Sequence, residues 1–184
     1  MAEAPTSTTV QTKLQRIAKQ ASDAPQMVFN NLAHLVDLDF LKEAYRRTRK
    51  DGAAGVDRTS AAEYGENLES NLQGLLERMK TGSYKAPPVR RVHIPKDDKG
   101  NTRPIGVPTF EDKVLQRAVA MVLEAIYEQD FSDCSFGFRP KRSAHQALEG
   151  LRRTLTEMGG GWVLEVDIRN FFDALDHVHL RDIL

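Results

Sequence analysis

The sequence predicts an α+β fold that is mostly helical and contains one β-hairpin and one further strand. Apolar residues recur at helical spacing over residues 60–79, 109–129 and 143–158. Alternating side chains lie on both sides of a turn at residues 97–101, as in a hairpin. A short apolar run with the two-residue period of a strand follows three glycines and covers residues 162–167.

The composition is that of a globular protein. The chain has 184 residues, of which 40% are hydrophobic and 28% are charged. No apolar run approaches the roughly 20 residues that a membrane span needs, and the N-terminus lacks a signal-peptide pattern. The single cysteine, Cys134, excludes an internal disulfide and suits a reducing compartment. We therefore expect a cytoplasmic protein without membrane contact.

The charges balance overall but are sorted along the chain. Lys and Arg together number 26, as do Asp and Glu, so the formal net charge is zero. Basic residues gather in residues 42–50, 85–103 and 139–153, whereas the acids gather elsewhere. Such sorting can form a basic groove for nucleic acid on a neutral protein. Ordinary solvated faces are the alternative.

The first sixty residues predict a mobile arm followed by short helices and a loop. Residues 1–24 are rich in Ala, Ser, Thr and Gln and carry only a faint apolar stripe. Residues 26–35 and 38–50 have helical patterns, with Asp37 as an N-cap. Residues 51–57 form a loop with two glycines, which serve either a tight turn or the close approach of a phosphate chain.

Two longer helices are predicted from their caps. Ser60 and Glu63 form a capping-box pattern that opens a helix to about Met79. Thr109 caps a helix to about Gln129 that is apolar on most faces and is therefore expected to be buried. The residues expected inside are Val114, Leu115, Ala118, Val119, Val122, Leu123 and Ile126.

A third helix begins after Ser143, which forms a capping pattern with Gln146, and runs to about Met158. Its expected buried face comprises Ala147, Leu148, Leu151 and Leu155. A basic loop precedes this helix, and helix N-termini with adjacent Arg or Lys bind phosphates. We interpret four residues as contacts to an RNA backbone: Arg139, Lys141, Arg142 and Ser143.

The predicted hairpin brings two cations together. Lys96 precedes the turn and Arg103 follows it, so the two side chains are expected to stand near each other. A Lys point charge beside an Arg fork suits a triphosphate. Solvated side chains that bind nothing are the alternative.

Asp167 stands at the end of the predicted strand. A carboxylate at the end of a mostly buried strand needs a charged partner, which is commonly a divalent cation. Capping of the following helix is the alternative. A zinc site at Asp176, His177 and His179 is not expected, because the spacing of the two histidines splays them on a helix.

Residues 167–173, Asp-Ile-x-x-Phe-Phe-Asp, resemble the first palm motif of reverse transcriptases, most closely those of group II introns. The resemblance implies that Asp167 binds both catalytic Mg²⁺ ions, with Ile168 as a further metal contact. It also implies that Phe172 lies under the sugar of the incoming dNTP and hinders a 2′-hydroxyl.

Two other stretches carry the same resemblance. Gly-Phe-Arg-Pro-x-Arg-Ser-x-His-x-Ala, at residues 137–147, recurs in group II intron reverse transcriptases. Arg-Val-His-Ile-Pro-Lys at 91–96 and Gly-Asn-Thr-Arg-Pro-Ile-Gly-Val-Pro at 100–108 resemble the fingers hairpin of those enzymes. In that hairpin Lys96 and Arg103 would hold the β- and γ-phosphates of the dNTP.

The N-terminal part resembles the extension of these enzymes, which lies over the template. This resemblance implies that Arg46 and Arg47 contact RNA. It also divides the chain into four parts: a mobile arm (1–24), an N-terminal extension (25–60), the fingers (61–160) and the start of a right-hand polymerase palm (161–184).

Together these resemblances imply the N-terminal portion of an RNA-directed DNA polymerase. Such a nucleotidyltransferase binds template or intron RNA, an RNA–DNA hybrid and dNTP, and uses two Mg²⁺ ions. The family's second acidic motif, Tyr-Ala-Asp-Asp, does not occur in these 184 residues, so we expect this chain alone to be inactive. An RNA-binding maturase module or an inactive remnant is the alternative. Lys96, Arg103 and Arg139 disfavour another palm enzyme, such as a cyclase.

Overall fold

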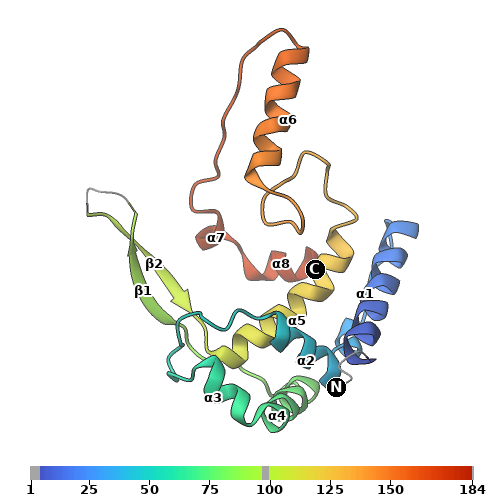
Figure 1. Cartoon of the computed structure of the whole chain (residues 1–184), viewed down its shortest axis with the longest axis vertical. Coiled ribbons are helices and arrows are strands. Elements are labelled where there is room, and N and C mark those ends of the chain that lie inside the picture. Colours follow the sequence, from blue (N-terminus) through green and yellow to red (C-terminus); the bar gives the residue numbers. More distant parts are fainter. Residues whose placement is uncertain (1–4, 97–99, 184) are drawn as a thin grey trace. The chain divides into compact units, whose positions relative to one another are not determined.

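The computed structural model of the chain describes residues 5–96 and 100–183. They form two compact units, of which the first ends at Phe131 and the second begins at Ser132. The first unit contains α1 (Pro5–Asp23), η1 (Leu32–Leu35), α2 (Leu38–Arg47), α3 (Ala61–Glu66), α4 (Leu68–Lys80), β1 (Arg90–Pro95), β2 (Thr102–Val107) and α5 (Phe110–Tyr127) (Figure 1). The second unit contains α6 (Ala144–Glu157), α7 (Phe171–Ala174) and α8 (His177–Ile183). The predicted α+β class, mostly helical with one hairpin, is confirmed.

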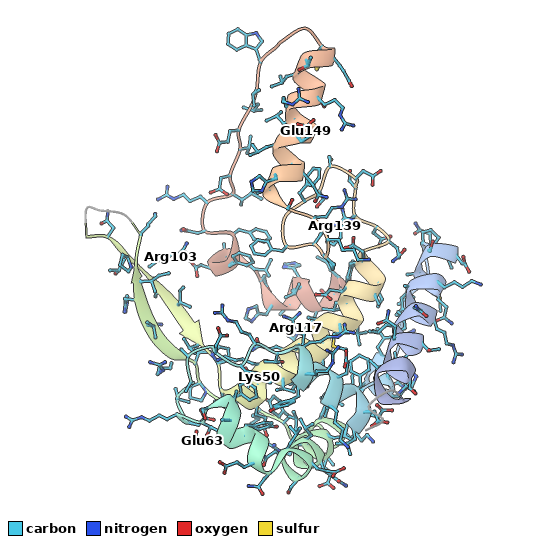
Figure 2. All side chains as sticks on the ribbon, in the orientation of Figure 1. Lys50, Glu63, Arg103, Arg117, Arg139 and Glu149 are labelled. Carbon is cyan, nitrogen blue, oxygen red and sulfur yellow. The ribbon has the colours of Figure 1, made fainter. Side chains whose placement is uncertain are left out.

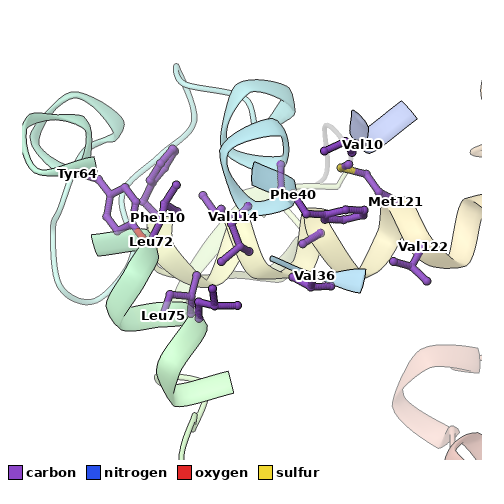
Figure 3. Packing of buried hydrophobic residues seen from close by; sticks show 14 of the residues in the cluster. Val10, Val36, Phe40, Tyr64, Leu72, Leu75, Phe110, Val114, Met121 and Val122 are labelled. Carbon is purple, nitrogen blue, oxygen red and sulfur yellow. The ribbon is translucent and has the colours of Figure 1, made fainter. Parts of the chain in front are cut away.

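The core of the first unit is built around α5. Val114 and Met121 of this helix are 0% and 2% exposed, and they pack with Phe40 of α2, Leu72 of α4 and Val10 of α1 (Figure 3). Each such side chain contributes about 1.5–3 kcal/mol when it leaves water. Helix α5 thus packs directly against α1 and α2, and α4 joins the same core through its contacts with α2. Of the residues expected inside α5, Val114, Ala118 and Val122 are buried, whereas Leu115, Leu123 and Ile126 are half-buried and Val119 is 47% exposed.

The expected mobile arm is not what the structure contains over residues 5–23. These residues form α1, and Val10, Leu14, Ile17 and Ala21 are all buried. They lie three or four residues apart on one face, so the faint stripe in the sequence is the face that packs. Lys13 also bonds to Asp37, the N-cap of α2. Composition suggested mobility here, and tertiary packing overrode it.

The caps predicted from the sequence are present, but two helices are shorter than expected. Ser60 and Glu63 make both bonds of the capping box, at 2.7 and 3.2 Å. The helix from Ser60 breaks at Asn67, whose φ of −120° is not helical, and α4 starts afresh. In residues 26–35 only η1 forms, preceded by Asn31 at φ 60°. α2 ends at Arg47, not at residue 50, since Thr48 is extended and its hydroxyl donates to the Ala44 carbonyl.

The hairpin has the predicted pairing. β1 and β2 are antiparallel, with Val92 opposite Ile105 and Ile94 opposite Arg103. The Lys96 amide donates to the Asn101 carbonyl at 2.7 Å and extends the pairing toward the turn. The predicted turn residues 97–99 lie outside the described residues.

Two expectations for the second unit are wrong. α6 forms after its Ser143 cap, but none of its four expected core residues is buried, and Leu148 is 65% exposed. Residues 162–167 form no strand, and Trp162 is fully exposed. An apolar period predicts which face can be covered, whereas burial and strand pairing both require a partner surface. In the described residues the only sheet is the β1–β2 hairpin.

Candidate functional site

The hairpin places its two predicted nucleotide-binding cations on one face. Arg103 is directly opposite Ile94, and Lys96 is two residues beyond Ile94, directly after the end of β1. Side chains two residues apart in a strand point the same way, so Lys96 and Arg103 are diagonal neighbours. Both are exposed, and Figure 2 shows Arg103 on the hairpin. The register therefore places a Lys point charge and an Arg fork on one face of the hairpin, and their binding of a nucleotide stays a prediction.

The acidic motif lies in the second unit and is open to solvent. Asp167, Ile168 and Phe172 line one depression, to which Asn170, Phe171 and Asp173 also contribute. Asn170 turns the chain at φ 53° into α7, and this turn brings the aromatic pair back toward Asp167. The rings of Phe171 and Phe172 meet edge-to-face with centroids 5.3 Å apart. Phe172 is 85% exposed, so its ring is free to contact a ligand.

The donors in this depression suit one side of a Mg²⁺ site. Asp167 offers an exposed carboxylate, and Ile168, whose side chain has no ligand atom, can offer only its backbone carbonyl. Mg²⁺ prefers such oxygen ligands. Across residues 5–96 and 100–183 no group of three His, Cys, Asp or Glu side chains could hold a metal. The donor set therefore fits part of a magnesium site.

Arg139 serves the loop in which it lies. It is only 9% exposed, and its Nη1 atom donates to the carbonyls of Ser132 and Ser135 at 2.7 and 2.9 Å. A planar guanidinium can satisfy several carbonyls at once, so this side chain closes the loop from 132 to 139. Of the residues interpreted as RNA contacts, Arg139 is the least accessible, which the sequence did not indicate.

The other residues of the basic loop are more accessible. Lys141 is exposed, at φ 61°, and forms no ion pair with a described residue. Arg142 is half-buried, with its guanidinium 5.6 Å from the ring of Phe136. The Ser143 hydroxyl accepts from the Gln146 amide at 3.3 Å, so it is the helix cap that the sequence predicted.

Arg46 and Arg47 share a single buried carboxylate. The Glu43 side chain is 3% exposed and accepts from both Nε atoms, at 2.7 Å from Arg46 and 2.6 Å from Arg47. A second bond from Arg46 Nη2, at 2.7 Å, completes a fork. Hydrogen bonds from Arg46 and then Arg47 lower the pKa of Glu43 to about 2, against the opposing effect of burial. The sequence revealed the two arginines but not the acid that orients them.

Comparison with known proteins identifies the family. A family model described as reverse transcriptase (RNA-dependent DNA polymerase) matches residues 94–182. The group II intron-encoded protein LtrA of Lactococcus lactis subsp. cremoris is 38% identical over 169 residues, which cover 91% of this chain and 28% of LtrA. The chain belongs to the group II intron-type reverse transcriptases.

Other proteins similar to this reverse transcriptase chain support the same family. Protein YkfC of Escherichia coli (strain K12) is 37% identical over 88% of this chain and 44% of YkfC. Nuclear intron maturase 2 of Arabidopsis thaliana, a mitochondrial protein, is 39% identical over 66 residues, or 36% of this chain. The reverse transcriptase chain thus spans between 28% and 44% of the length of LtrA and YkfC.

The region matched by the reverse transcriptase model contains the two predicted ligand groups. It includes Lys96 and Arg103 of the first unit and Asp167 of the second.

None of the helices described for this reverse transcriptase chain has the length and apolar character needed to cross a membrane.

Proposed function

We propose that this chain supplies the nucleotide- and template-binding part of an RNA-directed DNA polymerase. The observation that carries the proposal is the depression of the second unit, in which an exposed Asp167 carboxylate and an exposed Phe172 ring lie together. An accessible acid beside an aromatic platform suits a metal-bound nucleotide whose sugar rests on the ring.

The residues divide the work of binding the nucleotide. Lys96 and Arg103 would hold its β- and γ-phosphates, because a Lys point charge and an Arg fork on one strand face match a triphosphate. Phe172 would contact the sugar and select against a 2′-hydroxyl. Asp167 and the Ile168 carbonyl would hold Mg²⁺, which when bound lowers the pKa of the attacking hydroxyl and neutralises phosphate charge.

The template would run along basic residues. Lys141 and Arg142 flank the N-terminus of α6, and Arg46 and Arg47 end α2. Such contacts go to phosphates and read no bases, which suits an enzyme that copies any template. An RNA template, an RNA–DNA hybrid and dNTP are the proposed partners.

The test is primer extension with Mg²⁺ by a longer protein that contains this chain and the family's Tyr-Ala-Asp-Asp motif. Asp167→Asn should abolish cDNA synthesis and leave RNA binding within a few-fold. Glu165→Gln is the matched control, since Glu165 is also exposed, lies two residues away and is outside the depression. Full activity of Asp167→Asn, or equal loss in both variants, would remove Asp167 as a catalytic residue.

A second candidate is an RNA-binding maturase module without polymerase activity. The Arabidopsis relative is named an intron maturase, and the basic loop before α6 would serve intron RNA as well as a template. This function needs Lys141 and Arg142 but not Asp167. A longer protein that binds intron RNA but does not extend a primer, with or without Asp167→Asn, would favour this candidate.

A further inference from the structure

The β1–β2 hairpin depends on its two ends for its position. None of the described residues of β1 and β2 is buried, and a two-stranded hairpin alone is marginal in water. Lys96 and Arg103 lie toward its far end. Strand residues advance by roughly 3.3 Å, so Lys96 is about 20 Å from Arg90, and a rotation of about 10° at the base moves it by roughly 3 Å. The contacts at the base therefore decide where the two cations stand.

One aspartate of α5 is bonded to both ends of the hairpin. Tyr84, which lies six residues before β1, donates from its hydroxyl to Asp112 Oδ1 at 2.8 Å. Thr109, which lies two residues after β2, accepts a hydrogen bond from the Asp112 amide on its hydroxyl at 3.3 Å. Because β2 leads directly into α5, Asp112 contacts the chain both where it enters the hairpin and where it leaves (Figure 1).

The contacts of Asp112 are buried. Asp112 is 6% exposed and Thr109 is 3% exposed. Gln116 Nε2, one turn further along α5, donates to Asp112 Oδ2 at 2.8 Å, so each carboxylate oxygen has a side-chain donor. Burial, and then the bond to Asp112, raise the pKa of Tyr84, so its hydroxyl keeps the proton that it donates. A buried carboxylate with both oxygens bonded tolerates few other arrangements.

The segment between Tyr84 and β1 is stiff. Pro87 and Pro88 restrict its backbone, and the Tyr84 amide donates to the Arg78 carbonyl at 3.0 Å. A Cβ on Gly106 would come within 2.8 Å of Val89 Cγ2, so the residue before β1 packs directly on β2. A shift of Tyr84 would therefore move the hairpin instead of being absorbed in the connector.

We propose that Tyr84 and Asp112 are positioning residues for nucleotide binding, because their hydrogen bond fixes the base of the hairpin and so sets where Lys96 and Arg103 meet the triphosphate. The inference rests on the proposed function and adds to it two residues that touch no substrate. A misplacement of about 1 Å, caused by a change far from the reacting atoms, can cost up to about 100-fold in rate.

The test is primer extension over a range of dNTP concentrations by the longer protein that contains the Tyr-Ala-Asp-Asp motif. Tyr84→Phe removes only the donating hydroxyl, and it should raise KM for dNTP by roughly three- to ten-fold with kcat within about two-fold. Asp112→Ala should raise KM at least as much, whereas Asp112→Asn should stay near the wild type, since its amide oxygen still accepts from Tyr84. Tyr127→Phe is the matched control, because Tyr127 is half-buried in α5 and its hydroxyl has no hydrogen bond to a described residue.

A double variant separates positioning from a general loss of stability. If Tyr84 acts through Arg103, Tyr84→Phe should add little to the KM of Arg103→Ala. Fully additive effects, an unchanged KM in Tyr84→Phe, or a lowered kcat alone would each overturn the proposal. Circular dichroism melts establish that each variant is folded.

The position of the hairpin is also measurable in this chain without substrate. Spin labels at Thr102→Cys on β2 and Val119→Cys on α5, with Cys134→Ser, report their separation by double electron–electron resonance. Tyr84→Phe should broaden the distribution of distances, whereas Tyr127→Phe should not, and equal distributions would overturn the proposal. A broadened distribution, combined with a longer wild-type protein that extends no primer, would count against the proposed function and leave the role of Tyr84 in holding the hairpin standing.

Discussion

Glu43 is a buried acid that holds two arginines of the proposed template face. Its carboxylate accepts from Arg46 and Arg47 in one turn of α2, so each arginine loses conformational freedom before RNA arrives. The side chain is buried, so neutralising it takes the shared carboxylate away from both guanidinium groups and leaves a buried amide in its place. Breaking a buried pair costs far more than breaking an exposed one.

Glu43→Gln should therefore lower the free energy of unfolding at pH 7 by about 2–3 kcal/mol. Because the pKa of Glu43 falls from 4.5 to about 2 on folding, this contribution is complete above pH 4.5. It is lost as the pH falls through 2, where the two proteins should converge. Urea denaturation at several pH values measures the difference. Glu69→Gln is the control, since the Lys42–Glu69 pair is 71% exposed at Glu69 and should contribute under about 1 kcal/mol. A difference in unfolding free energy between the two proteins that does not change with pH would contradict the lowered pKa of Glu43.

Arg139 and Lys141 lie two residues apart but should behave differently. Arg139→Ala removes two bonds to loop carbonyls, so amide exchange in residues 132–143 should speed up. Lys141→Ala should leave exchange unchanged and lower the salt slope of RNA binding by about 0.7 if Lys141 contacts a phosphate. Hydrogen exchange and fluorescence anisotropy on both variants separate the roles. A lowered slope with unchanged exchange in Arg139→Ala would make Arg139 the RNA contact.

At the scale of elements, the loop between α2 and α3 depends on one glycine. Gly55 is required by close approach, because an added Cβ would meet backbone atoms of Thr109 at 2.6 and 2.7 Å. Backbone atoms at a helix start cannot move aside as the end of a flexible side chain can. The two glycines of this loop were predicted to serve a turn or a phosphate, and only the tertiary structure revealed that Gly55 packs against Thr109, the N-cap of α5.

Gly55→Ala should lower the free energy of unfolding by about 1–3 kcal/mol and weaken RNA binding by displacing the loop from α5. Gly74→Ala is the matched control, because an added Cβ meets nothing within 4 Å there and Gly74 lies inside α4. That control should raise stability by roughly 0.5–1 kcal/mol. Thermal and urea melts measure both effects. Equal stability of the two variants would show that the loop adapts to the extra methyl group.

The elements also show where sequence patterns succeed. Ser60, Thr109 and Ser143 begin their helices as predicted, because a cap depends on residues within one turn. The break at Asn67 was missed, since Asn71 Nδ2 donates to the Tyr64 carbonyl at 2.9 Å and stabilises the interruption from beyond it. Patterns predict helix starts better than interruptions that depend on side chains further along.

At the scale of the molecule, the buried apolar side chains are concentrated in the first unit. All buried hydrophobic residues of the described chain lie between Val10 and Val122, whereas α6 has none. A helix of 14 residues without a packed face is marginal in water. The two units should therefore differ in stability.

Native-state hydrogen exchange should reveal that difference. Amides of α2, α4 and α5 should exchange only by global unfolding, while those of α6 should exchange by local opening at least about 100-fold faster. Mass spectrometry of peptides from the intact chain at several denaturant concentrations measures this. Equal protection in α5 and α6 would mean that α6 is packed.

The sequence alone determined the mostly helical α+β class with one β-hairpin and the residues that cap the helices. It also determined the alternation that places Lys96 near Arg103 and the family motif around Asp167. These features depend on residues close together in the chain, whose geometry is set by local sterics and hydrogen bonds. Only the tertiary structure decided that α1 packs, that Gly55 lies against Thr109, that Glu43 is buried beneath two arginines, and that Tyr84 donates to Asp112. These features depend on surfaces brought together from distant segments, and no local pattern specifies which surfaces meet.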